Sequence, residues 1–173
     1  MKRIRGILVF FAVFFAAALS GVSPASASLD REGEWEGEIG VGVIFLEDES
    51  GPAVSGRFRY WFTDNFGFGP SFQMGFTDTT NQYLIRGLFR VGAEVVEGRS
   101  PLEVYAEAGA GVIILDVEGQ DTESALDIPF GGGFNWAISR NFGIFGGALV
   151  NVTNLEDEEF IPEFYGGVRV RFR

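Results

Sequence analysis

The stretch "FYGGVRVRFR", residues 164–173, alternates strictly between two kinds of position. Val168, Val170 and Phe172 share one parity, and Arg169 and Arg171 share the other. Period-two alternation is typical of a β-strand, whose successive side chains point to opposite faces. A soluble sheet would bury the valines and leave the arginines in water. The stretch therefore raises the question of which solvent lies on each face of the strand.

The same alternation occurs in further stretches, at residues 34–45, 55–63, 66–76, 83–95, 102–113, 126–138 and 142–152. One face of each stretch is large and apolar, and the other is rich in Gly, Glu and Arg. A glycine-rich face cannot fill the interior of a soluble barrel, whereas a membrane barrel places its apolar residues toward lipid and its polar residues inside. About ten tilted residues cross the hydrocarbon, and only a closed sheet leaves no unpaired backbone there. The predicted fold is all-β, an eight-stranded antiparallel up-and-down transmembrane β-barrel.

The connections between these stretches also alternate in length. Short turns are expected at residues 64–65, 97–101 and 139–141, and longer outer loops at 46–52, 78–82, 116–124 and 153–162. Trp35 and Trp136 fall near the turn end, where interfacial aromatic girdles lie. Pro70 lacks a ladder donor, so we expect a β-bulge there.

The N-terminus has the three-part pattern of a secretory signal peptide. A basic start is followed by an apolar run from Ile7 to Leu19 and by the small residues Ala25-Ser26-Ala27. The alternative is an uncleaved anchor helix, but the run is short for a bilayer, which needs roughly 20 residues. We therefore predict a signal peptide over residues 1–27 and one outer-membrane β-barrel domain over residues 28–173, in the cell envelope of a Gram-negative bacterium.

Charge and composition exclude several classes of function. The net charge of −11 becomes −14 once the three basic residues before the cleavage site are removed. Nucleic acid is excluded as a partner, because its binding depends on basic groups that meet phosphates. Cysteine and histidine are absent, so no disulfide framework and no thiolate metal site are expected. No catalytic residue, metal site or cofactor is predicted.

With these strands in place, the chain resembles the small outer-membrane β-barrel family that shares the fold of the outer membrane protein A membrane domain. The most motif-like segments are "VYAEAGAGV", residues 104–112, and the aromatic-ended last strand. The resemblance implies an outer-membrane location and contact with outer-membrane lipid and lipopolysaccharide. It also implies that the barrel assembly machinery recognises the last strand during insertion. The enzymes that use this fold depend on a histidine, so the resemblance implies that this chain is not an enzyme.

The inward faces of the predicted strands carry a set of charges of both signs. Because the first strand neighbours both the second and the last strand, we expect Arg169 and Arg171 to pair with Glu34, Glu36 or Glu38 across the closing seam. We expect Glu107 to lie beside Arg90, and Glu94, Glu103 and Asp127 to face the lumen too. The predicted lumen charge network is Glu36, Glu38, Arg57, Arg59, Arg86, Arg90, Glu107, Arg169 and Arg171.

Two functions remain open at this stage. Arginine suits partly buried pairs with carboxylates, and an eight-stranded lumen is narrow, which favours a plugged barrel acting as a structural or surface-interaction protein. Many lumen positions are Gly, which would leave room for water and favours a narrow, porin-like channel for small solutes or ions. A less favoured alternative is a soluble lipocalin-like binding barrel, in which Phe58, Phe72, Phe89 and Phe134 would point inward.

The predicted outer loops are acidic and carry no Lys or Arg. Solvation by negative charge is the simpler interpretation. The alternative is binding of divalent cations, since clusters of carboxylate oxygens suit Ca²⁺ or Mg²⁺ and could connect the loops to lipopolysaccharide phosphates.

Overall fold

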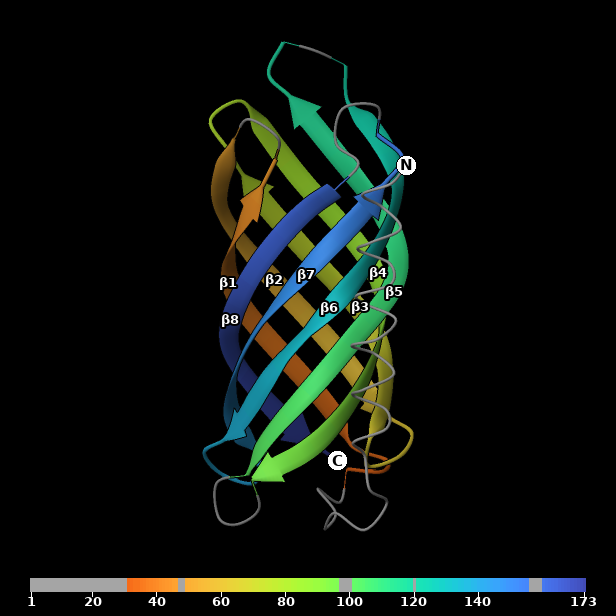
Figure 1. The fold of residues 1–173 in the computed structure, drawn as a ribbon, viewed down its shortest axis with the longest axis vertical. Coiled ribbons are helices and arrows are strands. Elements are labelled where there is room, and N and C mark those ends of the chain that lie inside the picture. The colour runs from red at the N-terminus through yellow and green to blue at the C-terminus, as the bar shows by residue number, and fades with distance from the viewer. Residues whose placement is uncertain (1–30, 47–48, 97–100, 120, 156–159) are drawn as a thin grey trace.

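A computed structural model gives the architecture and describes residues 31–46, 49–96, 101–119, 121–155 and 160–173. These residues form a closed barrel in which each strand pairs with its sequence neighbours and β1 pairs with β8 (Figure 1). The strands are β1 (Trp35–Phe45), β2 (Ser50–Trp61), β3 (Phe66–Phe76), β4 (Thr80–Val96), β5 (Leu102–Val117), β6 (Glu123–Ala137), β7 (Phe142–Thr153) and β8 (Phe160–Phe172). The predicted eight-stranded antiparallel barrel is therefore confirmed. The proposed signal peptide lies outside the described residues.

Burial alternates along the strands with the predicted phase. In β1, Ile39 and Val41 are 72% and 67% exposed, whereas Glu36, Glu38 and Gly40, on the opposite face, are buried. Phe58, Phe72, Phe89 and Phe134 are all exposed on the outer wall. A soluble binding barrel would bury such side chains, so the lipocalin-like alternative is wrong. Among the described residues, no helix has the length and apolar character needed to cross a membrane.

The strands extend farther toward the outer end than the sequence predicts. Pro52, expected in a loop, lies in β2 opposite Val43. Asp116 lies at the end of β5 opposite Asn81, and β8 begins at Phe160. The reason is that backbone pairing continues beyond the segment where one face is apolar. Side-chain alternation marks only the part of each strand with two contrasting environments.

The β-bulge expected at Pro70 is wrong. Pro70 pairs with Gly87 of β4, and β3 keeps one register along β2, with pairs on both sides of Pro70 at Arg57–Ser71 and Tyr60–Phe68. Proline removes a ladder donor but needs no extra residue in the strand. Its ring is exposed on the outer wall, where it disturbs no lumen contact.

The short turns lie at one end of the barrel, where an aromatic girdle surrounds part of the outer wall. Trp35 stacks on Phe58 at 4.9 Å between ring centroids, and Phe58 contacts Phe172 of β8. Phe66 and Phe68 both contact Phe89. Both ends of the described chain also lie here, because Arg173 bonds to Glu34.

Candidate functional site in the barrel lumen

The structure brings the nine predicted lumen charges together inside the barrel. Each is at most 5% exposed, although they come from β1, β2, β4, β5 and β8, which surround the axis. They are Glu36, Glu38, Arg57, Arg59, Arg86, Arg90, Glu107, Arg169 and Arg171.

Glu36 joins the two ends of the sheet. Its Oε2 accepts hydrogen bonds from Arg171 Nε at 2.8 Å and from Arg169 Nη1 at 3.1 Å, both across the β1–β8 seam. Its Oε1 accepts one from Arg59 Nη1 of β2 at 2.8 Å. A single buried carboxylate therefore holds arginines from both neighbouring strands.

In the part of the chain that the structure describes, Glu38 bonds across the lumen rather than to the β8 arginines. Arg90 of β4 donates to both of its oxygens, at 2.6 and 3.1 Å, in the bidentate geometry that suits a guanidinium and a carboxylate. Arg59 Nη1 donates at 3.3 Å. Of the glutamates expected at the seam, Glu36 is thus the one that binds Arg169 and Arg171. The oxygens of Glu38 are occupied by Arg90, whose long side chain reaches across the lumen.

Glu107 is the third carboxylate of the central group. Arg59 Nη2 lies 2.7 Å from its Oε1, Arg90 Nε lies 2.8 Å from the same oxygen, and Arg57 Nη1 lies 3.1 Å from Oε2. The Tyr165 hydroxyl also donates to Oε2 at 3.1 Å. Its neighbour Arg90 is the one predicted from sequence.

Two tyrosines complete this layer. The Arg90 guanidinium lies 3.7 Å from the Tyr105 ring centroid, and that of Arg57 lies 3.8 Å from the Tyr165 ring centroid. Both distances are within the range of cation–π attraction. The rings therefore cover arginine faces that carboxylates do not reach.

A second ionic group lies toward the outer end. Arg86 Nε donates to Asp127 Oδ2 at 2.6 Å, and its Nη2 donates to Glu163 Oε2 at 3.0 Å. Arg57 Nη2 lies 3.7 Å from Glu163 Oε1 and connects this group to the central one. Sequence reasoning missed Glu163, which has the parity of Arg169 and Arg171. Continuing that alternation one residue back from Phe164 would have found it.

At the turn end, Arg31 lies inside the barrel mouth before β1 begins. Its Nη1 lies 2.7 Å from Glu103 Oε1, and its guanidinium lies 3.7 Å from the Trp61 ring centroid. Its backbone N–H donates to Asp64 Oδ1. Both Arg31 and Trp61 are fully buried. No periodic signal covers Arg31, so its position could not be read from the sequence.

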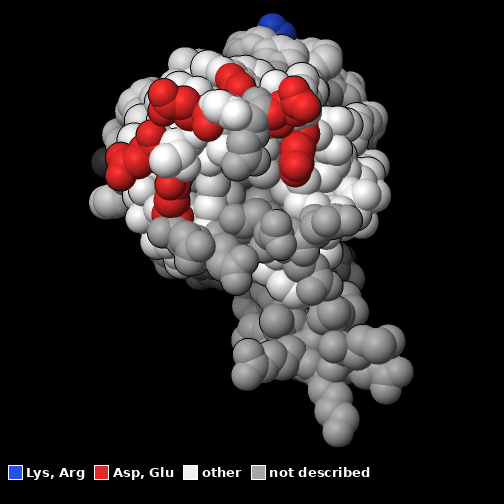
Figure 2. Space-filling view, turned by 90° about the horizontal axis from the view of Figure 1, so that it is seen from above, with Lys and Arg blue, Asp and Glu red and all other residues white. Residues whose placement is uncertain are grey.

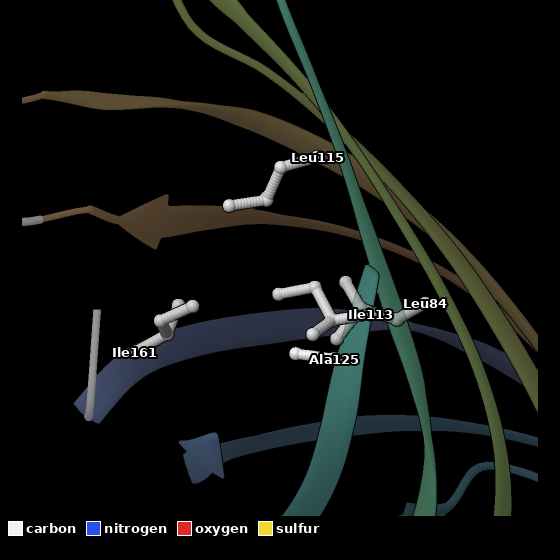
Figure 3. Packing of buried hydrophobic residues seen from close by; sticks show 5 residues of the cluster. All are labelled: Leu84, Ile113, Leu115, Ala125 and Ile161. Atoms are coloured by element: carbon white, nitrogen blue, oxygen red, sulfur yellow. The ribbon is translucent and has the colours of Figure 1, made fainter. Parts of the chain in front are cut away.

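At the outer end, part of the lumen is filled by apolar side chains, next to buried polar ones such as Gln82 and Asn151. The outer cluster consists of Leu84, Ile113, Leu115, Ala125 and Ile161, drawn from β4, β5, β6 and β8 (Figure 3). Leu46 and Leu155, from two different loops, pack against it. The layers along the axis are thus Arg31 with Trp61, the two ionic groups, and the outer cluster.

Several lumen glycines face bulky neighbours rather than open space. A Cβ added at Gly67 would lie 2.7 Å from Arg59 Cδ, and one at Gly133 would lie 2.7 Å from the Tyr105 hydroxyl. At Gly92 it would meet the Glu103 carboxylate. The space for water that was predicted at these glycines is occupied by large lumen side chains.

The outer end of the barrel carries carboxylates, as Figure 2 shows looking onto it. Within the described chain they include Glu49, Asp78, Asp116, Glu118, Asp121 and Glu123. No group of three or more such side chains that could hold a metal ion occurs in the part of the chain that the structure describes. Residues 47–48 and 156–159, which the cation hypothesis also invoked, lie outside that part.

Comparison with known proteins finds similarity in structure alone. No protein-family model matches the sequence, and no curated protein matches it. Among solved structures, the N-terminal β-barrel domain of Pseudomonas aeruginosa OprF is 16% identical with a TM-score of 0.63, covering 82% of this chain and 98% of that one. Neisserial surface protein A is 15% identical with a TM-score of 0.59, covering 82% and 98%.

Ail, the attachment invasion locus protein of Yersinia pestis, is 18% identical with a TM-score of 0.51 and covers 82% of this chain and 99% of its own. At these identities the similarity establishes the fold and no more. The chain has the fold of the eight-stranded outer-membrane β-barrels, as the resemblance seen in the sequence implied.

Proposed function

We propose that the protein is an integral outer-membrane barrel with a closed lumen, and that it acts as a structural or surface-interaction protein rather than as a pore. The observation that supports this proposal is the burial of large side chains along the lumen, from Arg31 and Trp61 at one end to the outer cluster at the other. The exposed apolar outer wall suits lipid.

Two features of the filling support closure. Within the described strands, the buried arginines and carboxylates form ion pairs with one another, which compensates their charges toward a passing ion. The outer cluster is apolar, and a narrow apolar constriction excludes water and ions. Ion passage would require both the separation of buried ion pairs and the wetting of this cluster.

A narrow channel remains the second candidate, because some polar atoms on the wall have no partner. Ser71 Oγ, Gln73 Oε1 and both amide atoms of Gln82 are buried without a hydrogen bond in the described chain. Buried polar groups of this kind are usually satisfied by water. A connected file of such waters would favour conduction.

Planar-bilayer recording separates the two candidates. The closed barrel gives no steady conductance, and truncation of the outer cluster by Ile113→Ala does not create one, because the ionic layers remain. A steady wild-type conductance that changes with Arg59→Ala or Glu107→Gln would instead establish the channel. Heat-modifiable gel mobility of each variant controls for folding.

The lumen also supports a non-enzymatic role. The chain has no histidine, and the buried carboxylates of Glu36, Glu38 and Glu107 are each bonded to two or more arginines. Their oxygens accept hydrogen bonds from guanidinium groups inside the lumen. Absence of hydrolytic activity on lipid and peptide substrates, in protein shown to be folded, is the corresponding test.

The acidic outer end suggests the kind of surface partner. A solved structure of Ail contains the polyanionic heparin analogue sucrose octasulfate. The predicted outer loops of this chain carry no Lys or Arg, so we expect it to repel such a ligand and to attract cationic partners. Proteoliposomes should retain a polylysine probe at low salt and release it at high salt, and should not retain heparin. Retention of heparin would contradict this assignment.

A further inference from the structure

The turn end of the barrel has a basic hollow beside the lipid-facing wall. It has a volume of about 330 Å³ and is lined by Glu34, Arg140, Asn141, Arg171, Phe172 and Arg173. Three of these six residues are arginines, from the β6–β7 turn and from the end of β8. The side chains of the hollow therefore combine an excess of positive charge with one aromatic wall.

Two of the arginines have donors to spare. Arg140 is exposed and has no hydrogen bond or ion pair with any residue that the structure describes. Arg171 uses Nε for Glu36, and its buried Nη2 has no hydrogen-bond acceptor among the described residues, although it forms a long ion pair with Glu103 Oε2 at 3.8 Å. A buried guanidinium nitrogen without an acceptor favours the arrival of an anion.

The third arginine and the one acid of the hollow neutralise each other. Arg173 Nε lies 3.1 Å from Glu34 Oε1. The negative charge of Glu34 is thus compensated by Arg173. Arg140 and the Nη2 of Arg171 then supply the positive charge that an incoming ligand would meet. The backbone is fixed here, because Asn141 and Arg171 exchange bonds, with Arg171 N–H donating to the Asn141 carbonyl and Asn141 Nδ2 donating to the Arg171 carbonyl.

The surroundings of the hollow indicate where that ligand comes from. Phe172 lines it and is 41% exposed on the outer wall. Ile138 and Phe142 flank Arg140 in sequence and are also exposed. Apolar side chains on the lipid-facing wall next to guanidinium groups provide both halves of a site for an amphipathic anion.

We propose that this hollow binds the phosphate headgroup of an anionic phospholipid in the leaflet that faces the periplasm, with Phe172 against the acyl chain. The site rests on the proposed membrane orientation. Arg140 contacts the phosphate from the turn, and Arg171 Nη2 donates from inside the mouth. Basic pockets at the edge of a membrane-embedded fold recognise headgroups in this way. The opposite, acidic end of the barrel has no matching group in its predicted loops.

The test is a lipid titration of the full chain refolded in a nonionic detergent, with bound lipid counted by native mass spectrometry. Phosphatidylglycerol is the probe, and phosphatidylcholine is the zwitterionic comparison. The wild type binds one phosphatidylglycerol more tightly than phosphatidylcholine. Arg140→Gln weakens that binding by roughly tenfold, the effect of one lost charge-assisted hydrogen bond, and Arg140→Lys weakens it less.

Thr122→Asp in the β5–β6 loop is the matched control, because it makes the same change in net charge at the opposite end of the barrel. It leaves phosphatidylglycerol binding unchanged. Equal binding by the wild type and Arg140→Gln, or equal loss in Thr122→Asp, would overturn the site. Competition by millimolar inorganic phosphate as effective as that by lipid would overturn the lipid assignment.

These outcomes are distinct from failure of the proposed function. A conducting barrel would reveal itself in bilayer recording, whatever its lipid binding. A chain that does not insert would lack heat-modifiable mobility before any lipid is added.

Discussion

Removal of the Glu36 charge should destabilise the barrel more than any other single neutralisation at the seam. Glu36→Gln keeps the shape of the side chain but takes the negative charge away from Arg59, Arg169 and Arg171, which bond to it at 2.8 to 3.1 Å. Glu36 is fully buried. Breaking a buried ion pair by removing one partner costs ~3–5 kcal/mol, because the remaining charge is left uncompensated.

Glu34→Gln is the matched control for this prediction. It lies two residues earlier on the same strand face, but its partner Arg173 is 60% exposed, and pairs exposed to that degree contribute about 0–1 kcal/mol. The assay is urea unfolding in lipid vesicles, with the folded fraction measured from the heat-modifiable mobility shift on gels. Equal destabilisation by the two substitutions would refute the reasoning, because it would mean that the lumen is wet enough to solvate the arginines.

A double-mutant cycle locates the coupling within the seam. Glu36→Gln combined with Arg169→Ala should cost less than the two single effects added, by about 0.5–3 kcal/mol, since the two residues share a bond. The Glu38→Gln and Arg169→Ala pair should be closer to additive, because Glu38 bonds to Arg90 and Arg59 instead. A larger coupling for Glu38 than for Glu36 would contradict the observed pairing.

Two further predictions concern packing and loop chemistry. Gly67→Ala should destabilise the barrel by ~1–3 kcal/mol through overpacking, because the added Cβ lies 2.7 Å from an arginine carbon. The control Gly56→Ala adds a Cβ that meets nothing within 4 Å, so its free energy of unfolding in urea should stay within about 0.5 kcal/mol of the wild type. Equal costs of the two substitutions would contradict a tightly packed lumen. Hydrogen bonds from Thr77 and Thr79 hold the pKa of the Glu49 carboxyl below its ordinary value, so its contribution to stability is present above the ordinary pKa and is lost as pH falls through the lowered one. Thr79→Val should raise the pKa of Glu49 in an NMR titration, and an unchanged value would contradict the role of that bond.

Much of the fold could be predicted because, in a membrane barrel, apolar and polar side chains alternate along each single strand. The contrast between Val168 or Val170 and Arg169 or Arg171 fixes strand phase with no knowledge of partners. Once the strands are ordered as a meander, adjacency follows, and the Arg90–Glu107 contact follows from adjacency. Side chains that face each other across neighbouring strands are therefore predictable from alternation.

Contacts across the lumen could not be predicted in the same way. Glu38 bonds to Arg90, which lies three strands away, because the lumen is narrow enough for a long side chain to cross it. Arg31 enters the mouth from a segment with no periodicity. The outer cluster was missed because Leu115, Ala125 and Ile161 lie beyond the alternating stretches. Leu84 and Ile113 lie at the outer ends of two stretches, where the polar-inside pattern no longer holds. These features depend on the closed three-dimensional arrangement rather than on local pattern.

Two tryptophans of the described strands face opposite sides of the barrel wall. Trp136 is 48% exposed on the outer wall, and Trp61 is fully buried in the lumen beside Arg31. Single-tryptophan proteins that retain one or the other can be reconstituted in vesicles containing lipids brominated along the acyl chain. We expect strong quenching of Trp136 fluorescence and little quenching of Trp61 fluorescence. Equal quenching of the two, or quenching of neither, would contradict a barrel with lipid outside and a packed, ion-paired interior.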